Sequence, residues 1–428
     1  MNTHFSATWR GKASMLSLAV AVPAAVAVDA SLAANHGKKQ AAPLETTQPA
    51  HVAPWARYGD WPKTDWKDYN TLTTLASPPR ADPPPKLDGP IQGDPKKGAQ
   101  LAFDRSRGGS CVACHIMGSG TPALPGNVGL DLSTYGTWGR DDQWIFNYIY
   151  DPRSVNPESV MPPWGTHRVF SVDEIKDIVA FLKTLKEPAQ FKDPLENPAS
   201  RPVPQETRDN LDPFVNTAME SFERGKRAFA EAGPRGRACL SCHAAPEKAF
   251  KNWAAGMPKY EPRMKKVLNV EEFVTRHARA TTGAELPMQS DGNIALAIYL
   301  KHLANGQPFK VDIASPGAKE AAARGKDLMQ RKIGQLNFAC IDCHSPDKGA
   351  NKWIRGQWLT ESRGQTAHFP TWRTSRSEIW DLRKRFQWCG VAIRANELPP
   401  DAPEYGDLEL YLTSLNNGEK LSVPGIRH

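Results

Sequence analysis

The sequence predicts a mainly α-helical chain in which three helical domains follow one another behind a proline-rich amino-terminal arm. The first observation is a short motif, Cys-x-x-Cys-His, that occurs three times. The second is an internal repeat, because Tyr299 and Leu300 begin a segment that returns at Tyr411 and Leu412, 112 positions later (411 − 299 = 112). The third is the pattern around the motifs, which alternates helical stretches with loops and suggests no extended sheet.

The three motifs have the spacing at which c-type haem is attached. Both thiols form thioethers to the haem vinyl groups, and the histidine that follows binds the iron. A redox dithiol or half of a zinc site is the alternative for an isolated copy, and three copies disfavour it. The sequence therefore predicts three covalently bound haem c groups in three tandem class I cytochrome c-like domains. The motif residues are Cys111, Cys114 and His115, then Cys239, Cys242 and His243, then Cys340, Cys343 and His344.

The amino terminus has the pattern of an export signal, with Arg10 and Lys12 before the apolar stretch 13–28. Covalent haem attachment takes place outside the cytoplasm, so we expect a protein of the periplasm. No later stretch approaches spanning length, and we expect no membrane span in the mature protein, a membrane-tethered form being the alternative. The formal net charge of +8 is offset by haem propionates. Without a basic run interleaved with aromatic residues, we expect no nucleic-acid partner.

Composition and helix signals divide the chain into six segments. Pro83–Pro85 mark the arm, and the capping box from Ser171 to Glu174 opens the last helix of the first domain. The predicted segments are a signal peptide (1–34), the arm (35–90), a monohaem domain (91–186), a linker (187–212), a second haem unit (213–311) and a third (312–428).

Each haem iron needs a second axial ligand, which sets its potential and reactivity. In the first domain the candidate is Met161, which lies between Val160 and two prolines on a loop well after the motif. Met117 is too close to His115 to reach the opposite face. A core methionine is the structural alternative for Met161, and His167 is a weaker candidate for the same role.

The repeat supplies the candidates for the other two haems. Adding 112 to 277 gives 389, so His277 occupies the place of Cys389, and a ligand role for one favours the same role for the other. His277 follows a helix start and falls on a helical stretch. Met288 and His302 compete with His277, and a solvent-facing histidine is the structural alternative.

Cys389 is the seventh cysteine and the only one outside the three motifs. Its sequence neighbours Arg383, Lys384, Arg385 and Arg394 make a cationic setting, which lowers the pKa of a thiol and attracts anions. The counterpart of Arg385 in the repeat is a phenylalanine, at position 273 (385 − 112 = 273). This asymmetry predicts that the third haem meets a substrate while the second only passes electrons. Neutralisation of haem propionates by the arginines is the alternative.

These residues resemble a known family. Cys340–His344, Arg385–Cys389, Arg394–Leu398 and the end of the chain, Glu404–Arg427, resemble SoxA, the larger subunit of the SoxAX cytochromes of bacterial sulfur oxidation. In the first domain Gly126–Gly129, Asp131–Leu132 and Asn156–Pro163 resemble the small partner SoxX. The resemblance covers nearly all of the predicted mature chain and implies a natural SoxX–SoxA fusion.

The resemblance also implies a function. SoxAX cytochromes join thiosulfate oxidatively to a cysteine on the SoxYZ carrier, and two electrons leave through the haems to a small cytochrome c. It implies a haem-dependent L-cysteine S-thiosulfotransferase in which Cys389 is catalytic and a haem ligand. Arg385 matches the arginine thought to hold the anion, and charge adds Lys384 to the thiosulfate site. His277 departs from the cysteine usual in dihaem SoxA proteins, which implies a bis-histidine second haem.

Two other functions remain open. A thiosulfate dehydrogenase, which couples two thiosulfates to tetrathionate, also uses a haem with histidine and cysteine ligands. A pure trihaem electron-transfer subunit of a membrane dehydrogenase predicts three ordinary axial pairs and leaves Cys389 without a role.

Overall fold

The predicted export signal and most of the predicted arm lie outside the part of the chain that the structure describes. All described residues belong to one compact unit, so the domain boundaries drawn from the sequence remain predictions. Within the described residues, no helix combines the length and the apolar character needed to cross a bilayer. The computed structural model describes residues 68–75, 83–105, 110–119, 124–204 and 210–427.

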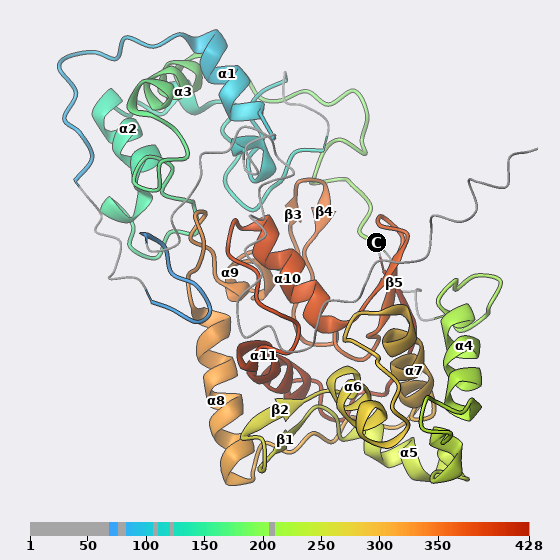
Figure 1. Cartoon of the computed structure of the whole chain (residues 1–428). Coiled ribbons are helices and arrows are strands. Elements are labelled where there is room, and N and C mark those ends of the chain that lie inside the picture. The colour runs from blue at the N-terminus through green and yellow to red at the C-terminus, as the bar shows by residue number, and fades with distance from the viewer. Residues whose placement is uncertain (1–67, 76–82, 106–109, 120–123, 205–209, 428) are drawn as a thin grey trace, which may run out of the picture. The chain divides into compact units, whose positions relative to one another are not determined.

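Helices dominate the described chain, as the sequence predicts, and fall into three groups, one around each motif (Figure 1). In each group the helix before the motif packs on a helix well after it: α1 on α3, α4 on α7 and α8 on α11. The helices are α1 (Pro95–Phe103), α2 (Asp142–Tyr150) and α3 (Val172–Thr184) in the first group, α4 (Met219–Ala230), α5 (Pro246–Ala255), α6 (Val270–Thr281) and α7 (Asp291–His302) in the second, and α8 (Pro316–Gln330), α9 (Cys340–His344), α10 (Leu382–Ala392) and α11 (Pro403–Ser414) in the third.

A glycine in the first helix of each group lets the two packed helices touch. A Cβ atom added at Gly98, Gly225 or Gly325 would lie 2.0, 2.0 or 2.1 Å from a backbone carbonyl oxygen of the opposing helix. These distances are shorter than van der Waals contact, so a larger residue would force the helices apart. All three groups therefore have a glycine at the same helix crossing, although their sequences differ.

The internal repeat is confirmed in the structure. Helix α11 begins 112 residues after α7 (403 − 291 = 112), and both helices have 12 residues. Helix α10 begins 112 residues after α6 (382 − 270 = 112). The predicted correspondence of His277 with Cys389 is therefore a correspondence between two equivalent helices.

Short strands accompany the helices, and those described form three small sheets. Strand β7 runs parallel to β5, with Thr371 opposite Gly425, so the end of the described chain lies beside the hairpin that leads into α10. The sequence did not predict these hairpins, whose strands have only two or three residues. They are β1 (Lys259–Glu261) with β2 (Lys266–Leu268), β3 (Trp353–Ile354) with β4 (Gln357–Trp358), and β6 (Glu378–Trp380) with β5 (Thr371–Arg373) and β7 (Gly425–Arg427).

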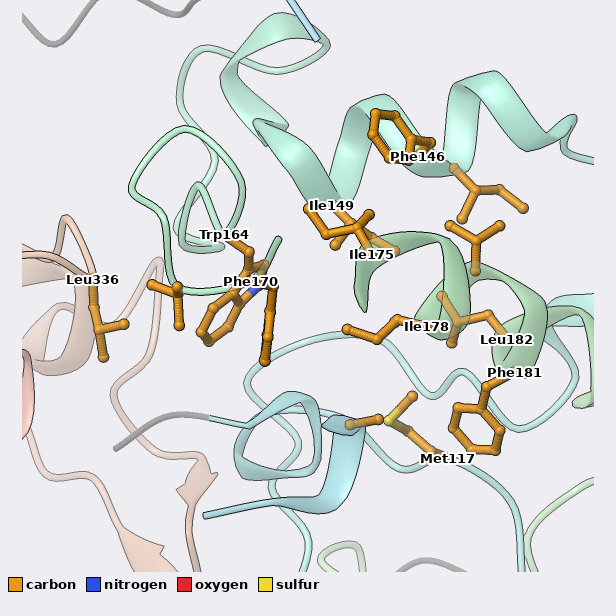
Figure 2. Packing of buried hydrophobic residues seen from close by; sticks show 14 residues of the cluster. Met117, Phe146, Ile149, Trp164, Phe170, Ile175, Ile178, Phe181, Leu182 and Leu336 are labelled. Atoms are coloured by element: carbon orange, nitrogen blue, oxygen red, sulfur yellow. The ribbon is translucent and has the colours of Figure 1, made fainter. Parts of the chain in front are cut away.

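The core of the first group lies between α2, α3 and the loop that carries Met161. Helix α3 begins with the predicted capping box, in which Ser171 and Glu174 exchange hydrogen bonds. Leu336, from the third group, packs into the same cluster beside Trp164 (Figure 2). The cluster shown in Figure 2 contains Met117, Phe146, Ile149, Trp164, Phe170, Ile175, Ile178, Phe181, Leu182 and Leu336.

Candidate functional site

Helix α10 presents Cys389 and Arg385 on the same face. The helix begins after Asp381, whose side chain accepts a hydrogen bond from the backbone N–H of Lys384 at 2.6 Å and so caps the first turn. Residues four apart lie above one another on a helix. Arg385 therefore lies one turn before Cys389, with its charge close to the thiol.

The thiol of Cys389 lies against the histidine of the third motif. Burial raises the pKa of Cys389, but the charge of Arg385, the hydrogen bond with His344 and the charge of Arg373 together lower the pKa to about 7. The structure thus brings together Cys389, His344 and Arg385, as the sequence predicts. A sulfur with this pKa is partly thiolate at neutral pH, which is the form that binds metals and attacks sulfur.

The other cations expected near Cys389 have partners elsewhere. The ammonium of Lys384 pairs with Glu378 on β6. Arg383 is fully buried and pairs with Glu272 on α6 and Glu409 on α11. Arg394 is 1% exposed, and its Nη1 donates to the Gln335 side chain at 2.8 Å. Of the four cations, Arg385 is the one whose charge acts most strongly on the thiol.

Arg373 is the residue that the sequence analysis missed. It lies on β5, sixteen positions before Cys389 (389 − 373 = 16), and its charge reaches the thiol. Its guanidinium carbon lies 5.5 Å from the ring centroid of Trp380 on β6. Nothing in the local sequence indicates this proximity, because it depends on a short hairpin that folds back over α10.

The motif histidines in the first and third groups have the orientation that a haem-binding histidine needs. His115 Nδ1 donates to the Leu130 carbonyl oxygen at 2.7 Å, and His344 Nδ1 donates to the Thr360 carbonyl oxygen at 2.8 Å. This bond fixes the tautomer and leaves Nε2 to bind the iron. A Cβ atom at Gly129 would lie 2.2 Å from His115 Cε1, so a glycine is needed to let the ring lie there.

In the second group His243 faces His277. The two ring centroids are 6.2 Å apart, with an angle of 52° between the ring planes. A metal–imidazole bond is about 2 Å long, so two rings that share one metal have their centroids about 6 Å apart. The pair therefore fits one iron atom between the rings. Phe273 stacks on His277 at 5.2 Å and 14°, which holds that ring in place.

The competing ligands of the second haem have other surroundings. His302 Nδ1 donates to the Val423 carbonyl oxygen at 2.8 Å, and its ring lies 4.2 Å from that of Phe222. Met288 is buried, with 7% of its surface exposed. Among the described residues it is the ring of His277 that faces His243, so His277 remains the preferred candidate.

In the first group Met161 is half-buried and packs against the same apolar cluster as Cys111. His167, its weaker rival, is 3% exposed, and its Nδ1 donates to the Gln335 carbonyl oxygen in the third group at 2.7 Å. His167 therefore contributes to the contact between the two groups. Its buried Nε2 has no hydrogen-bond partner among the described residues, so both residues stay candidates and Met161 remains the prediction.

The first and third motifs lie close together. Asn127 N–H donates to the Trp353 carbonyl oxygen and Arg355 N–H donates to the Ala113 carbonyl oxygen, each at 3.0 Å. The sulfurs of Cys389 and Cys114 are also close enough to Cys343 to interact electrostatically with it. Haem groups attached at these motifs would be near each other, as electron transfer between them requires.

Comparison with known proteins first gives the class of protein. Residues 224–309 match the description "SoxA/TsdA, cytochrome c domain". Residues 95–182 match a second one, "Cytochrome C oxidase, cbb3-type, subunit III". Together with the motif geometry, these matches define a cytochrome with covalently bound haem c.

The relatives then give the family. The L-cysteine S-thiosulfotransferase subunit SoxA of Pseudaminobacter salicylatoxidans is 33% identical over 225 residues, which are 52% of this chain and 77% of the relative. The subunit of the same name from Chlorobaculum thiosulfatiphilum is 31% identical over 209 residues, 48% of this chain and 70% of the relative. The chain belongs to the SoxA family, and the predicted resemblance is confirmed. The predicted enzyme class agrees with the names of these relatives.

A solved structure is also similar. The crystal structure of SoxXA from P. pantotrophus aligns with a TM-score of 0.46 at 28% identity, covering 50% of this chain and 80% of that chain.

Proposed function

We propose that the chain oxidatively conjugates thiosulfate to a cysteine of a SoxYZ-like carrier protein. The reaction is carrier–SH plus thiosulfate dianion giving carrier–S–S–SO₃⁻, one proton and two electrons. One sulfur–sulfur bond forms, the carrier thiol loses its proton, and both electrons leave the sulfur pair. The observation that carries the proposal is the position of Cys389 in a SoxA-family chain, between Arg385 and His344.

The residues around the thiol have distinct roles in this proposal. Cys389 would bind the iron of the third haem, and its sulfur would either hold the sulfane sulfur of thiosulfate or pass charge to the iron. Arg385 binds the thiosulfate anion and offsets its loss of water, since a guanidinium matches such oxygens with two N–H groups. Arg373 adds a second positive charge that the structure brings to the same thiol. Lys384 was expected to assist, but its pairing with Glu378 limits it to a smaller contribution.

We infer three haem c groups, one at each motif. Haem, when bound, accepts one electron at a time. The proposed axial pairs are His115 with Met161, His243 with His277, and His344 with Cys389. We infer that the first group is a SoxX-like domain, so that one chain would contain both halves of a SoxAX cytochrome. Its contact with the third group supports this arrangement.

The proposed reaction needs two partners. One is the carrier, whose reactive cysteine must reach Cys389 on a mobile segment, because Cys389 is largely buried. The other is a small cytochrome c that takes up the two electrons. We place the protein in the periplasm, as the export signal and the haem attachment predict.

A second function has its own support. The matched description covers both SoxA and TsdA proteins, and a thiosulfate dehydrogenase would join two thiosulfate ions to one tetrathionate with release of two electrons. Cys389 and Arg385 would serve that reaction as well. The two functions differ in whether the second sulfur comes from a protein.

The experiment that separates them measures thiosulfate-dependent reduction of a small cytochrome c by the full haem-loaded chain. It is run with and without a carrier that has a cysteine on its carboxyl-terminal arm. We expect reduction to require the carrier, and the carrier mass to increase by one thiosulfate. Reduction without the carrier, with tetrathionate as product, would overturn the proposal in favour of the dehydrogenase.

A further inference from the structure

Three buried carboxyl groups lie together at the contact between α6, α10 and α11. They are Glu271, Asp381 and Glu409, which are 0%, 0% and 3% exposed. The negative charges of Glu271 and Glu409 both act on Asp381, and Glu271 also acts on Glu409, so the three groups are mutual neighbours. None of them belongs to a haem motif or to the proposed substrate site. We call them the carboxylate cluster.

Two oxygens of the carboxylate cluster are buried without a hydrogen-bond partner among the described residues. They are Asp381 Oδ2 and Glu271 Oε2. Glu409 Oε2, by contrast, accepts hydrogen bonds from Arg383 at 2.8 Å and Asn269 at 3.0 Å. A buried carboxylate oxygen that accepts no hydrogen bond is costly when charged, and binding a proton removes that cost.

A small cavity of about 20 Å³ touches the cluster and is lined by Glu409, Lys301 and Thr366, among others. The Thr366 hydroxyl is buried and has no hydrogen-bond partner among the described residues. The volume is enough for one water molecule, the kind of group through which a carboxyl proton exchanges.

The charges around the cluster leave one negative charge uncompensated. Among the described residues, the buried cations that pair here are Arg383, Lys301 and Lys266, with side chains 0%, 12% and 11% exposed. They face four carboxyl groups, the three of the cluster and Glu272. The fourth cation, Arg276, also pairs with Glu272 but is 43% exposed, so water screens its charge. One bound proton would balance the buried set.

Charged groups on the flanking elements have their own partners. Asp407 on α11 pairs with Arg324 at 2.6 Å, and Lys384 pairs with Glu378. Asp401 lies 3.8 Å from Arg276. The cations in these pairs, Arg324, Lys384 and Arg276, therefore already have acidic partners and do not supply the positive charge that the cluster lacks.

The cluster connects the two helices that carry the proposed sixth ligands. Asp381 caps α10 eight residues before Cys389, and Asn269 caps α6 eight residues before His277. Eight residues of helix span about 12 Å. We propose that the carboxylate cluster is a proton-binding site. It takes up one proton from water when an electron arrives near Cys389 on α10 or near His277 on α6, and it returns the proton when the electron leaves. The inference rests on the haem ligands of the proposed function.

The electrostatics agree with this role. Burial, followed by the charge of Glu271, raises the pKa of Asp381 to about 7. Burial likewise raises the pKa of Glu409. The proton occupancy of Asp381 therefore changes in the neutral pH range, where a nearby charge can alter it.

The test compares Asp381→Asn with wild type in the full haem-loaded chain. Asparagine caps helices as well as aspartate and already stands at the equivalent position 269, so we expect the variant to fold. At about 12 Å and an effective dielectric constant of about 20, one electron changes proton affinity about tenfold. This is ~59 mV for a one-electron couple. We expect the reduction potential of a wild-type haem to fall by about this amount between pH 6 and pH 8, and this pH dependence to be lost in the variant.

Asp94→Asn is the matched control, because Asp94 caps α1 from an exposed position in the first group. We expect it to keep the wild-type pH dependence. A second measurement compares thermal unfolding. The variant should unfold at a higher temperature than wild type, and the gap should grow as the pH rises from about 4 to about 7, because the unfolded chain can ionise Asp381 while the folded protein must protonate it or bury its charge. If Asp381→Asn keeps the full pH dependence of the potential, Asp381 is only a helix cap and the inference fails. Carrier conjugation is also measured in the same variant. If Asp381→Asn keeps the pH dependence but still conjugates thiosulfate, the inference fails while the proposed function stands.

Discussion

Helices α6 and α10 occupy equivalent places in the repeat, yet nearly every functional position differs between them. The helices start 112 residues apart and begin after a side-chain cap of the same kind. The second group has two histidine rings 6.2 Å apart with a phenylalanine stacked on one of them. The third group has a thiol with cations around it. The paired positions are Asn269 with Asp381, Glu271 with Arg383, Phe273 with Arg385, and His277 with Cys389.

Under the proposed function, a few side chains on one helix decide whether a haem site meets a substrate. The glycine-closed helix crossings, which build the scaffold, are the same in both groups. In the second group the apolar Phe273 stacks on His277. In the proposed function, Arg385 of the third group attracts an anion to the sulfur of Cys389. Substitutions that exchange these residues test the comparison directly.

The largest effect is expected when Cys389 is changed to histidine, which gives the third site the ligand of the second. The variant should keep its haems but lose carrier conjugation on the order of 1,000-fold or more, because the sulfur proposed to hold the sulfane sulfur or to pass charge to the iron is gone. Conjugation rate and the visible spectrum are the measurements. His277→Cys is the reciprocal variant and should not gain conjugation at the second site. A Cys389→His protein that still conjugates thiosulfate would remove Cys389 from the mechanism.

The next largest effect concerns stability. Arg383→Met leaves Glu272 and Glu409 buried without their shared cation, and we expect a loss of about 3 to 5 kcal/mol in the free energy of unfolding. Denaturant unfolding of the haem-loaded chain measures it. Arg276→Met removes a half-exposed partner of the same Glu272 and should cost about 1 kcal/mol or less. Equal losses of unfolding free energy in the two variants would show that the buried ion pairs of Arg383 stabilise the fold no more than the half-exposed pair of Arg276.

Arg385→Gln should lower kcat/KM for thiosulfate by about 10- to 100-fold, because a hydrogen bond between charged groups is worth about 1.5 to 3 kcal/mol. The matched variant is Lys384→Gln, which removes a cation one position away that pairs with Glu378. We expect it to change kcat/KM by less than about fivefold, the size of a surface ion pair. Steady-state conjugation assays compare them, and a larger loss in Lys384→Gln would reverse the assignment.

The smallest effect is expected from Phe273→Leu, which removes the ring stacked on His277. Aromatic pairs contribute about 0.5 to 1.5 kcal/mol beyond the area they bury. We expect a small fall in the unfolding temperature and a shift in the potential of the second haem, with conjugation less affected. Met264→Ala, a truncation at the exposed surface of the same group outside the haem motif, serves as the control. An unchanged potential in Phe273→Leu would mean that the stack does not hold the ligand.

The sequence predicts the scaffold well because its signals are local or repeated. The motifs place six cysteines and three histidines, and the offset of 112 identifies His277 and Cys389 as equivalent before any coordinates are known. Ser171 with Glu174 marks the start of α3 correctly. These predictions need only the spacing of residues along one helix or between two copies.

The surroundings of Cys389 were harder to predict because they depend on which way side chains point. Four cations stand near it in the sequence, but Arg383 points into the protein interior and Lys384 pairs with β6. Arg373 reaches the thiol from a hairpin that has no periodic pattern long enough to detect. The carboxylate cluster could not be predicted for the same reason, because its members lie on or at the start of three different helices and become adjacent only after folding.

Backbone hydrogen bonds join the first and third motif regions within one chain, so their contact should not depend on protein concentration. Asn127 with Trp353, and Arg355 with Ala113, join surfaces that belong to one chain. The effective concentration of one surface around the other is therefore set by the connecting residues and not by how much protein is present. A pair of separate subunits held by the same few bonds would come apart at low abundance, whereas these two surfaces find each other again after every opening.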